Sequence, residues 1–182
     1  MRVLGGAVRG HSLLSTKGKG LRPTTSKVRK ALFDMLEQVA QSWDRALDLY
    51  AGTGSLGIEA LSRGAEWVDF VDSNPQHCHI IRSNLQRLGL EDRTGVRCQS
   101  LPGALKGLSG SYDIVLMDPP YAQNTGIEII RELIRLALVK EGAVIAFEHG
   151  RRGSITEEQP FLKLHRERNY GDTHLSIYTI GG

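Results

Sequence analysis

Three apolar runs of this chain end at aspartates whose carboxylates can act together. Asp48 stands directly before a glycine turn, and Asp72 ends the next apolar run. A third run, Ile114-Val-Leu-Met117, leads into Asp118-Pro-Pro-Tyr121. Together these three strand ends describe a pocket for a methyl donor beside a clamp for a planar nitrogen atom of an acceptor.

The glycine turn is compatible with two kinds of ligand. Gly52-Thr-Gly54-Ser-Leu-Gly57 fits the pattern of a dinucleotide-binding turn, and Asp72 falls near the spacing of a ribose-binding carboxylate. The pattern alone permits NAD as well as S-adenosylmethionine, and a tight turn without any ligand would also contain these glycines. Asp48 favours the methyl donor, because a carboxylate beside the turn attracts an ammonium and a sulfonium and repels a pyrophosphate.

The Asp118-Pro-Pro-Tyr121 loop indicates an exocyclic amine as the acceptor. Such a nitrogen is a poor nucleophile because its lone pair is delocalised into the ring. Hydrogen bonds to the Asp118 carboxylate and the Pro119 carbonyl would pull the nitrogen toward tetrahedral geometry, ready to attack the donor methyl in line. Pro119 and Pro120 stiffen the loop, and Tyr121 offers a ring on which a flipped base stacks. The alternative is an acid–proline turn that only ends a strand.

The basic residues gather at the beginning of the chain. The formal net charge is only +3, yet the first eight basic residues all precede Asp34, the first acidic one: Arg2, Arg9, Lys17, Lys19, Arg22, Lys27, Arg29 and Lys30. A localised positive field attracts a polyanion, and the glycines among these residues would let the backbone approach phosphates. A solvated basic tail without a ligand is the alternative.

Hydrophobic spacing predicts strands that alternate with helices. After a capping cluster at 24–26, a helix buries one face through Val39 and leaves Lys27, Arg29 and Lys30 largely free. Further strands are predicted at 46–50, 68–71, 96–98, 113–117 and 143–147, and helices at 56–62, 75–88 and 127–137. This alternation predicts a mostly parallel sheet covered on both faces, and the last two extended runs, 161–168 and 174–180, predict a terminal antiparallel hairpin.

Length and composition narrow the class of protein. The 182 residues fit one domain, with a basic extension over 1–25 and a catalytic core over 26–182. Two cysteines imply no disulfide scaffold, and neither an apolar run of about 18 residues nor a secretory signal is apparent. We therefore expect a cytoplasmic monomer. His77, Cys78 and His79 are consecutive on a predicted helix and diverge, so no metal site is expected.

The motifs resemble, in order over nearly the whole chain, those of the RsmD family of bacterial 16S ribosomal RNA guanine-N2 methyltransferases. The segments that carry the resemblance are Arg22-Pro-Thr24 with Val28-Arg29, the stretch from Leu47 to Ala65, Asp118-Pro-Pro-Tyr121 and His165-Arg-Glu-Arg168. The resemblance implies an α/β fold of the class I, Rossmann-like methyltransferase type, with a mostly parallel seven-stranded sheet, a terminal antiparallel hairpin and a small basic N-terminal hairpin extension. It also implies 16S ribosomal RNA, in the small subunit or an assembly intermediate, as the partner.

The resemblance assigns roles to individual residues. S-adenosylmethionine would be held by Asp48, Tyr50, Gly52, Gly54, Asp72, Ser73 and Ser100. The target base would meet Asp118, Pro119 and Tyr121, and the RNA would be gripped by Arg2, Arg9, Arg22, Thr24, Arg29 and Pro120. One departure concerns the adenine amine: where the family often carries an acid after the third strand, Gln99-Ser100 stands here, which leaves the Ser100 hydroxyl or a backbone group for that contact.

Three other functions fit part of the sequence. A DNA adenine-N6 methyltransferase also uses an Asp-Pro-Pro-Tyr loop, but usually needs a target-recognition region for which little room is left here. A protein-glutamine methyltransferase commonly has Asn in place of Asp118. This function would also leave the basic N-terminal arm unexplained. A non-enzymatic RNA-binding module would leave Asp48, Asp72 and Asp118 unexplained. The residues alone do not distinguish guanine from adenine. The choice of guanine as the target base therefore depends on the family resemblance.

Overall fold

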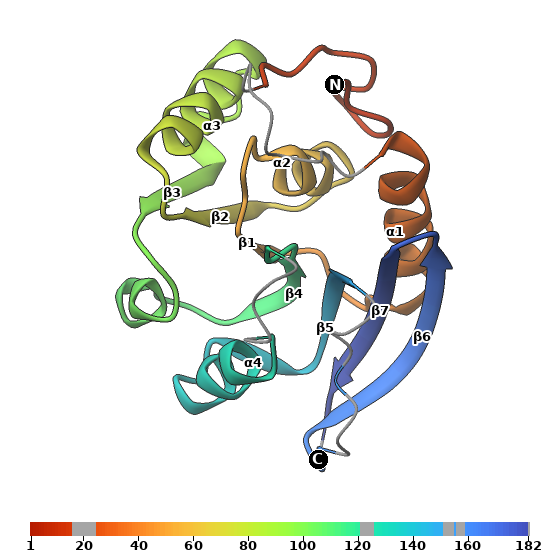
Figure 1. The fold of residues 1–182 in the computed structure, drawn as a ribbon. Coiled ribbons are helices and arrows are strands. Elements are labelled where there is room, and N and C mark those ends of the chain that lie inside the picture. Colours follow the sequence, from red (N-terminus) through yellow and green to blue (C-terminus); the bar gives the residue numbers. More distant parts are fainter. Residues whose placement is uncertain (16–24, 121–125, 151–154, 156–158, 182) are drawn as a thin grey trace.

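Seven strands form a single sheet in the order β3-β2-β1-β4-β5-β7-β6 (Figure 1). The computed structural model describes residues 1–15, 25–120, 126–150, 155 and 159–181. The strands are β1 (Arg45–Leu49), β2 (Trp67–Asp72), β3 (Thr94–Cys98), β4 (Tyr112–Met117), β5 (Val139–Gly150), β6 (Leu162–Tyr170) and β7 (Thr173–Ile180). β1 to β5 pair in parallel, whereas β7 is antiparallel to both β5 and β6. The mostly parallel sheet and the terminal hairpin are confirmed.

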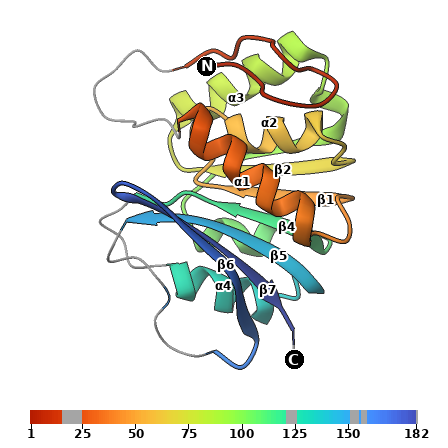
Figure 2. The same ribbon diagram turned by 90° about the vertical axis from the view of Figure 1, so that its right-hand side faces the viewer.

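Helices cover both faces of the sheet (Figure 2). On one face lie α1 (Ser26–Val39), α2 (Ser55–Ser62) and α3 (Pro75–Leu88), whose apolar side chains share one buried cluster with inward residues of the strands. On the other face, α4 (Gly126–Arg135) and the short 3-10 helix η2 (Gly103–Gly107) contribute to a second buried cluster. This two-sided cover explains why β4 is buried along its whole length. A shorter 3-10 turn, η1 (Glu91–Arg93), precedes β3.

The helix ends follow from local chemistry. The Thr25 hydroxyl accepts a hydrogen bond from the Val28 N–H at 3.3 Å and so caps α1. The Asn74 side chain caps α3 in the same manner, and Gly89 closes that helix in the left-handed conformation. The predicted start of α1 and the predicted end of α3 are therefore confirmed.

The N-terminal arm, residues 1–15, packs against α2 and α3 rather than extending into solvent (Figure 1). The Leu4 and Gly5 N–H groups each donate to the buried Glu59 carboxylate on α2 at 2.8 Å. Val3 and Leu13 are buried in the same cluster as α1 and α2. The arm is thus part of the core on one face of the sheet.

The prediction that Arg29 lies on the free side of α1 is wrong. Its side chain is completely buried, and its guanidinium donates to the Arg2 carbonyl of the arm and lies 4.0 Å from the Glu59 carboxylate. Burial lowers the pKa of Arg29, an effect that the neighbouring Glu59 charge opposes. The arm covers this side of the helix, so Arg29 holds the arm and is not available to a phosphate in this arrangement.

No helix in the described part of the chain is long and apolar enough to cross a membrane. β5 begins earlier than the predicted strand at 143–147, because Val139 already pairs with Tyr112 of β4, and it ends later, because pairing with β7 continues through Gly150. Glu148 and His149 therefore belong to the strand, and both side chains are buried.

Candidate active site

The chain turns sharply between β1 and α2. Tyr50 adopts a left-handed backbone conformation with φ 59°, a strained state for a residue with a side chain, and such strain is often found at functional sites. Gly54 caps α2 with φ 76°, and a Cβ atom there would lie 3.2 Å from Ile81. Gly57 lets the helix approach the sheet, since a Cβ atom would lie only 2.3 Å from the Phe70 ring. The first turn of α2 is therefore fitted closely to β2.

Two carboxylates hold this turn by accepting hydrogen bonds from its backbone. Asp48, which is 1% exposed, accepts from the Gly57 N–H at 2.8 Å. Asp72, at the end of β2, accepts from the Gly52 N–H at 2.8 Å through one oxygen. Its other oxygen accepts from the Asn74 N–H at 2.8 Å and lies 3.1 Å from His77 Nδ1. Asp72 thus fixes the glycine turn and the start of α3 at once.

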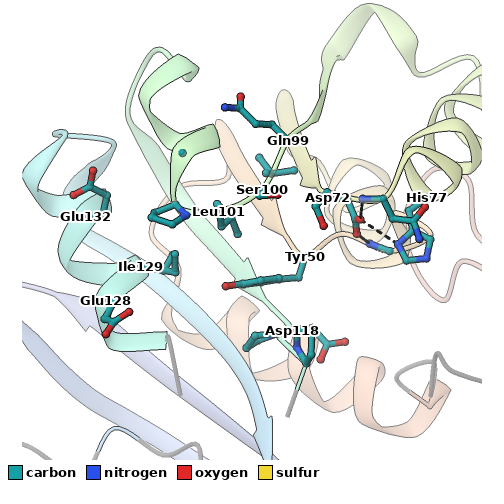
Figure 3. A pocket seen from close by; sticks show the side chains of 18 of the residues that line it. Tyr50, Asp72, His77, Gln99, Ser100, Leu101, Asp118, Glu128, Ile129 and Glu132 are labelled. Carbon is teal, nitrogen blue, oxygen red and sulfur yellow. Dashed lines mark hydrogen bonds and ion pairs between the residues drawn. The ribbon is translucent and has the colours of Figure 1, made fainter. Parts of the chain in front are cut away.

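A cleft of about 990 Å³ opens at the carboxyl ends of β1, β2 and β4 (Figure 3). Figure 3 shows the Tyr50 ring reaching from the end of β1 toward α4, with Asp118 close to it and Asp72 farther along the cleft wall. Eight of the residues predicted to bind donor or acceptor line this cleft: Tyr50, Gly52, Asp72, Ser73, Ser100, Asp118, Pro119 and Pro120. The structure therefore brings the donor turn and the Asp-Pro-Pro loop to one space.

Asp48 and Gly54 do not line the cleft. Asp48 lies behind the glycine turn, where burial raises its pKa well above the usual range, and the charges of Asp118 and Asp72 raise it further. Asp118 and Asp72 are thus close enough to Asp48 for their charges to act on its carboxyl group. Asp72 and Asp118 both line the cleft, and such acidic groups fit a cationic ligand.

The wall opposite Asp72 includes residues that the sequence did not single out. They follow β3 or lie on α4 and η2: Leu101, Pro102, Gly103, Lys106, Glu128, Ile129 and Glu132. The spacing of α4 indicated only a core helix, although Glu128 and Glu132 alternate with its apolar face and were a visible signal. Gln99 and Ser100 both line the cleft, which is compatible with the predicted contact of Ser100 with an adenine.

The predicted RNA-binding residues are scattered. Arg2 and Arg9 are exposed on the arm, whereas Arg29 is buried beneath it. Arg22 and Thr24, and with them Tyr121 of the acceptor loop, lie outside the described residues. No group of His, Cys, Asp or Glu within the described ranges is arranged to hold a metal ion. Burial raises the pKa of Cys78 to about 12, as expected for a core thiol.

Comparisons with known proteins agree with this geometry. A family model described as "Conserved hypothetical protein 95" matches residues 1–179. "Putative rRNA methyltransferase YlbH" of Bacillus subtilis is 36% identical, with all of both chains covered. "Ribosomal RNA small subunit methyltransferase D" of Haemophilus influenzae is 34% identical, with 98% of this chain and 93% of the relative covered. The solved structure of "Putative methyltransferase yhhF" from Escherichia coli superposes with a TM-score of 0.86 and 30% identity, covering 100% of this chain and 98% of that one.

The sheet order, the glycine turn and these solved relatives define a class I methyltransferase, in which S-adenosylmethionine is the methyl donor. Since the family model and the relatives both span nearly the entire chain, the chain belongs to the RsmD family.

Proposed function

We propose that this protein transfers a methyl group from S-adenosylmethionine to the exocyclic N2 amine of one guanine in 16S ribosomal RNA. The observation that carries the proposal is the shared cleft, in which Asp118 and Pro119 stand beside Tyr50 and Asp72. An amine held by the Asp-Pro-Pro loop would therefore face the donor. The names of the relatives, which specify ribosomal RNA of the small subunit, support the choice of RNA as substrate.

The donor side is suited to the methyl donor by charge and by backbone geometry. The donor supplies an electrophilic methyl group on a positively charged sulfur. Asp72 presents its carboxylate at the cleft wall, where the Gly52 and Asn74 N–H groups fix its position, and this supports a role in binding the ribose hydroxyls. Asp48 lies behind the turn without a place on the cleft surface, and its carboxyl oxygen accepts a hydrogen bond from the Gly57 N–H. We infer that Asp48 acts on the donor by holding the turn, not through direct contact.

The acceptor side activates the nitrogen. The Asp118 carboxylate and the Pro119 carbonyl would each accept a hydrogen bond from the amine. These two bonds would localise the nitrogen lone pair. The nitrogen–carbon bond then forms as the sulfur–carbon bond breaks, and the released proton passes to Asp118 or to water. Holding the two reacting atoms about 3 Å apart accounts for much of the acceleration, since proximity alone can offset several kcal/mol of barrier.

The substrate is an assembled or partly assembled small subunit rather than free RNA. The exposed cations of the arm and of α1, among them Arg2, Arg9, Lys27 and Lys30, are suited to phosphates but read no sequence. Selection of one guanine then depends on the shape of the folded RNA and its bound proteins. We infer that the protein acts as a cytoplasmic monomer.

Mass spectrometry of 16S ribosomal RNA tests the proposal directly. In a strain that lacks the protein, one N2-methylguanosine should be missing, and purified protein with labelled donor should restore it on subunits better than on naked RNA. Label in N6-methyladenosine, or equal label in every guanine context, would contradict the guanine assignment. RNA binding without any binding of the donor would instead indicate a non-enzymatic RNA-binding module.

A further inference from the structure

One buried amide connects the N-terminal arm to the donor turn. Asn84 lies on α3 and is 1% exposed. Its Oδ1 accepts from the Leu14 N–H at 2.7 Å, and its Nδ2 donates to the Leu14 carbonyl at 3.2 Å and to the Thr53 carbonyl at 3.1 Å. Both amide hydrogens are therefore used, one on the arm and one on the turn.

The Thr53 contact reaches the donor cleft within one residue. Thr53 stands between Gly52, whose N–H donates to Asp72, and Gly54, which begins α2. Thr53 is 9% exposed, so its carbonyl has little access to water as a replacement for Asn84. A movement of the Asn84 amide is therefore passed to the turn that positions Gly52 and Asp72.

The Leu14 contact reaches the part of the arm beside Arg2. The Leu13 N–H donates to the Met1 carbonyl at 2.9 Å, and Ser12 pairs with Arg2, an exposed cation of the arm. The far end of the arm is held separately, because Ser62 donates to the Gly5 carbonyl and accepts from the Val8 N–H. Asn84 thus anchors the arm on the side of Arg2, and the donor turn is its other partner.

We propose that Asn84 is a positioning residue that couples RNA binding on the arm to donor binding in the cleft. The inference rests on the proposed function, since it takes RNA as the ligand of the arm. RNA on the arm favours the position of Leu14 that Asn84 holds, and the donor favours the turn that Asn84 holds. Each ligand therefore tightens the other, and by linkage the two factors are equal, about 5-fold or more.

The experiment measures the affinity for S-adenosylhomocysteine, which cannot react, with and without small subunits purified from a strain lacking the protein. In the wild type the subunits should tighten its binding by about 5-fold or more. Asn84→Ala should reduce this ratio to nearly one. Asn84→Asp should do the same while it preserves side-chain size, because a carboxylate can still accept from the Leu14 N–H but cannot donate to the Leu14 and Thr53 carbonyls.

Ser62→Ala is the matched control, because it loosens the far end of the arm without touching the donor turn. It should weaken subunit binding and keep the wild-type ratio. A ratio of one in the wild type, or a wild-type ratio in Asn84→Asp, would overturn the coupling even if methylation of guanine N2 proceeds. Failure of the wild type to methylate subunits would overturn the proposed function instead, so the two failures are distinguishable.

Discussion

The donor turn and the N-terminal arm are both built around buried charged groups, but the charges are combined in opposite ways. Behind the turn, the pKa of Asp48 is raised by burial and by the like charges of Asp118 and Asp72. Beneath the arm, Glu59 is met by Arg29, Arg63 and the N–H groups of two arm residues. Opposite charges satisfy one another and stabilise structure, whereas gathered like charges favour a ligand of the other sign.

The largest effect is expected at Asp118. Asp118→Ala should lower turnover by about 100-fold or more, the usual range for a group that handles a proton at the reacting atom, and leave donor affinity nearly unchanged. Single-turnover kinetics with saturating subunits and calorimetry with the donor would measure the two quantities. Near wild-type turnover in this variant would remove Asp118 from the acceptor clamp.

The charged groups buried beneath the arm should affect the stability of the fold and not the affinity for the donor. Arg29→Ala should lower the free energy of unfolding by about 3 kcal/mol, because it leaves Glu59 with one fewer buried cation. The exposed pair of Lys30 with Asp34 provides the control, and Lys30→Ala should change stability by no more than about 0.5 kcal/mol. Urea unfolding measures the free energy of unfolding of both variants. Equal decreases in the two variants would show that the buried Arg29 stabilises the fold no more than the exposed Lys30.

Asp72 should affect donor binding by a smaller amount. Asp72→Ala removes the acceptor of the Gly52 and Asn74 N–H groups and the predicted partner of the ribose, and should weaken donor binding by about 1–3 kcal/mol. Calorimetry with the donor and with NAD provides the measurement. Tight NAD binding and no response to the donor would show that the turn is a dinucleotide site.

The smallest expected effect concerns salt. Since Arg29 is buried, the exposed Lys27 and Lys30 are the cations of α1 to neutralise. Changing both Lys27 and Lys30 to Gln should make the decrease of log affinity for RNA with log salt less steep. The change in slope should be about 0.7–0.9 for each phosphate that the protein no longer neutralises. Arg131→Gln with Arg135→Gln, on the opposite face of the sheet, is the matched control. If both double variants have the same slope, Lys27 and Lys30 do not contact the RNA phosphates.

The sequence predicts the donor side well because parallel strands constrain it. Once Asp48, Asp72 and Asp118 are placed at strand ends, the sheet brings them to one edge, and no long-range packing has to be guessed. The predicted elements were confirmed for the same reason, with differences mainly at their ends. Whether each lining residue contacts a ligand remains a prediction.

Arg29 was misplaced because two faces of α1 are covered and only one was anticipated. The buried face of α1 includes Phe33 and Leu36, which stand four and seven positions after Arg29 and therefore lie on its side of the helix. That spacing was a visible signal of a wider buried stripe. The part played by Asn84 had no such signal, since it depends on where the arm lies against α3, many residues away in sequence.

The gathered negative charge also bears on the release of products. Methyl transfer converts the sulfonium of the donor into a neutral thioether, so the Asp72 carboxylate at the cleft wall attracts the product less than the incoming donor. S-adenosylhomocysteine should on this ground dissociate more readily than the donor, and the enzyme would be less prone to inhibition by its own spent cofactor. The acidic group that Asp72 places at the cleft wall thus favours release of the product as well as capture of the donor.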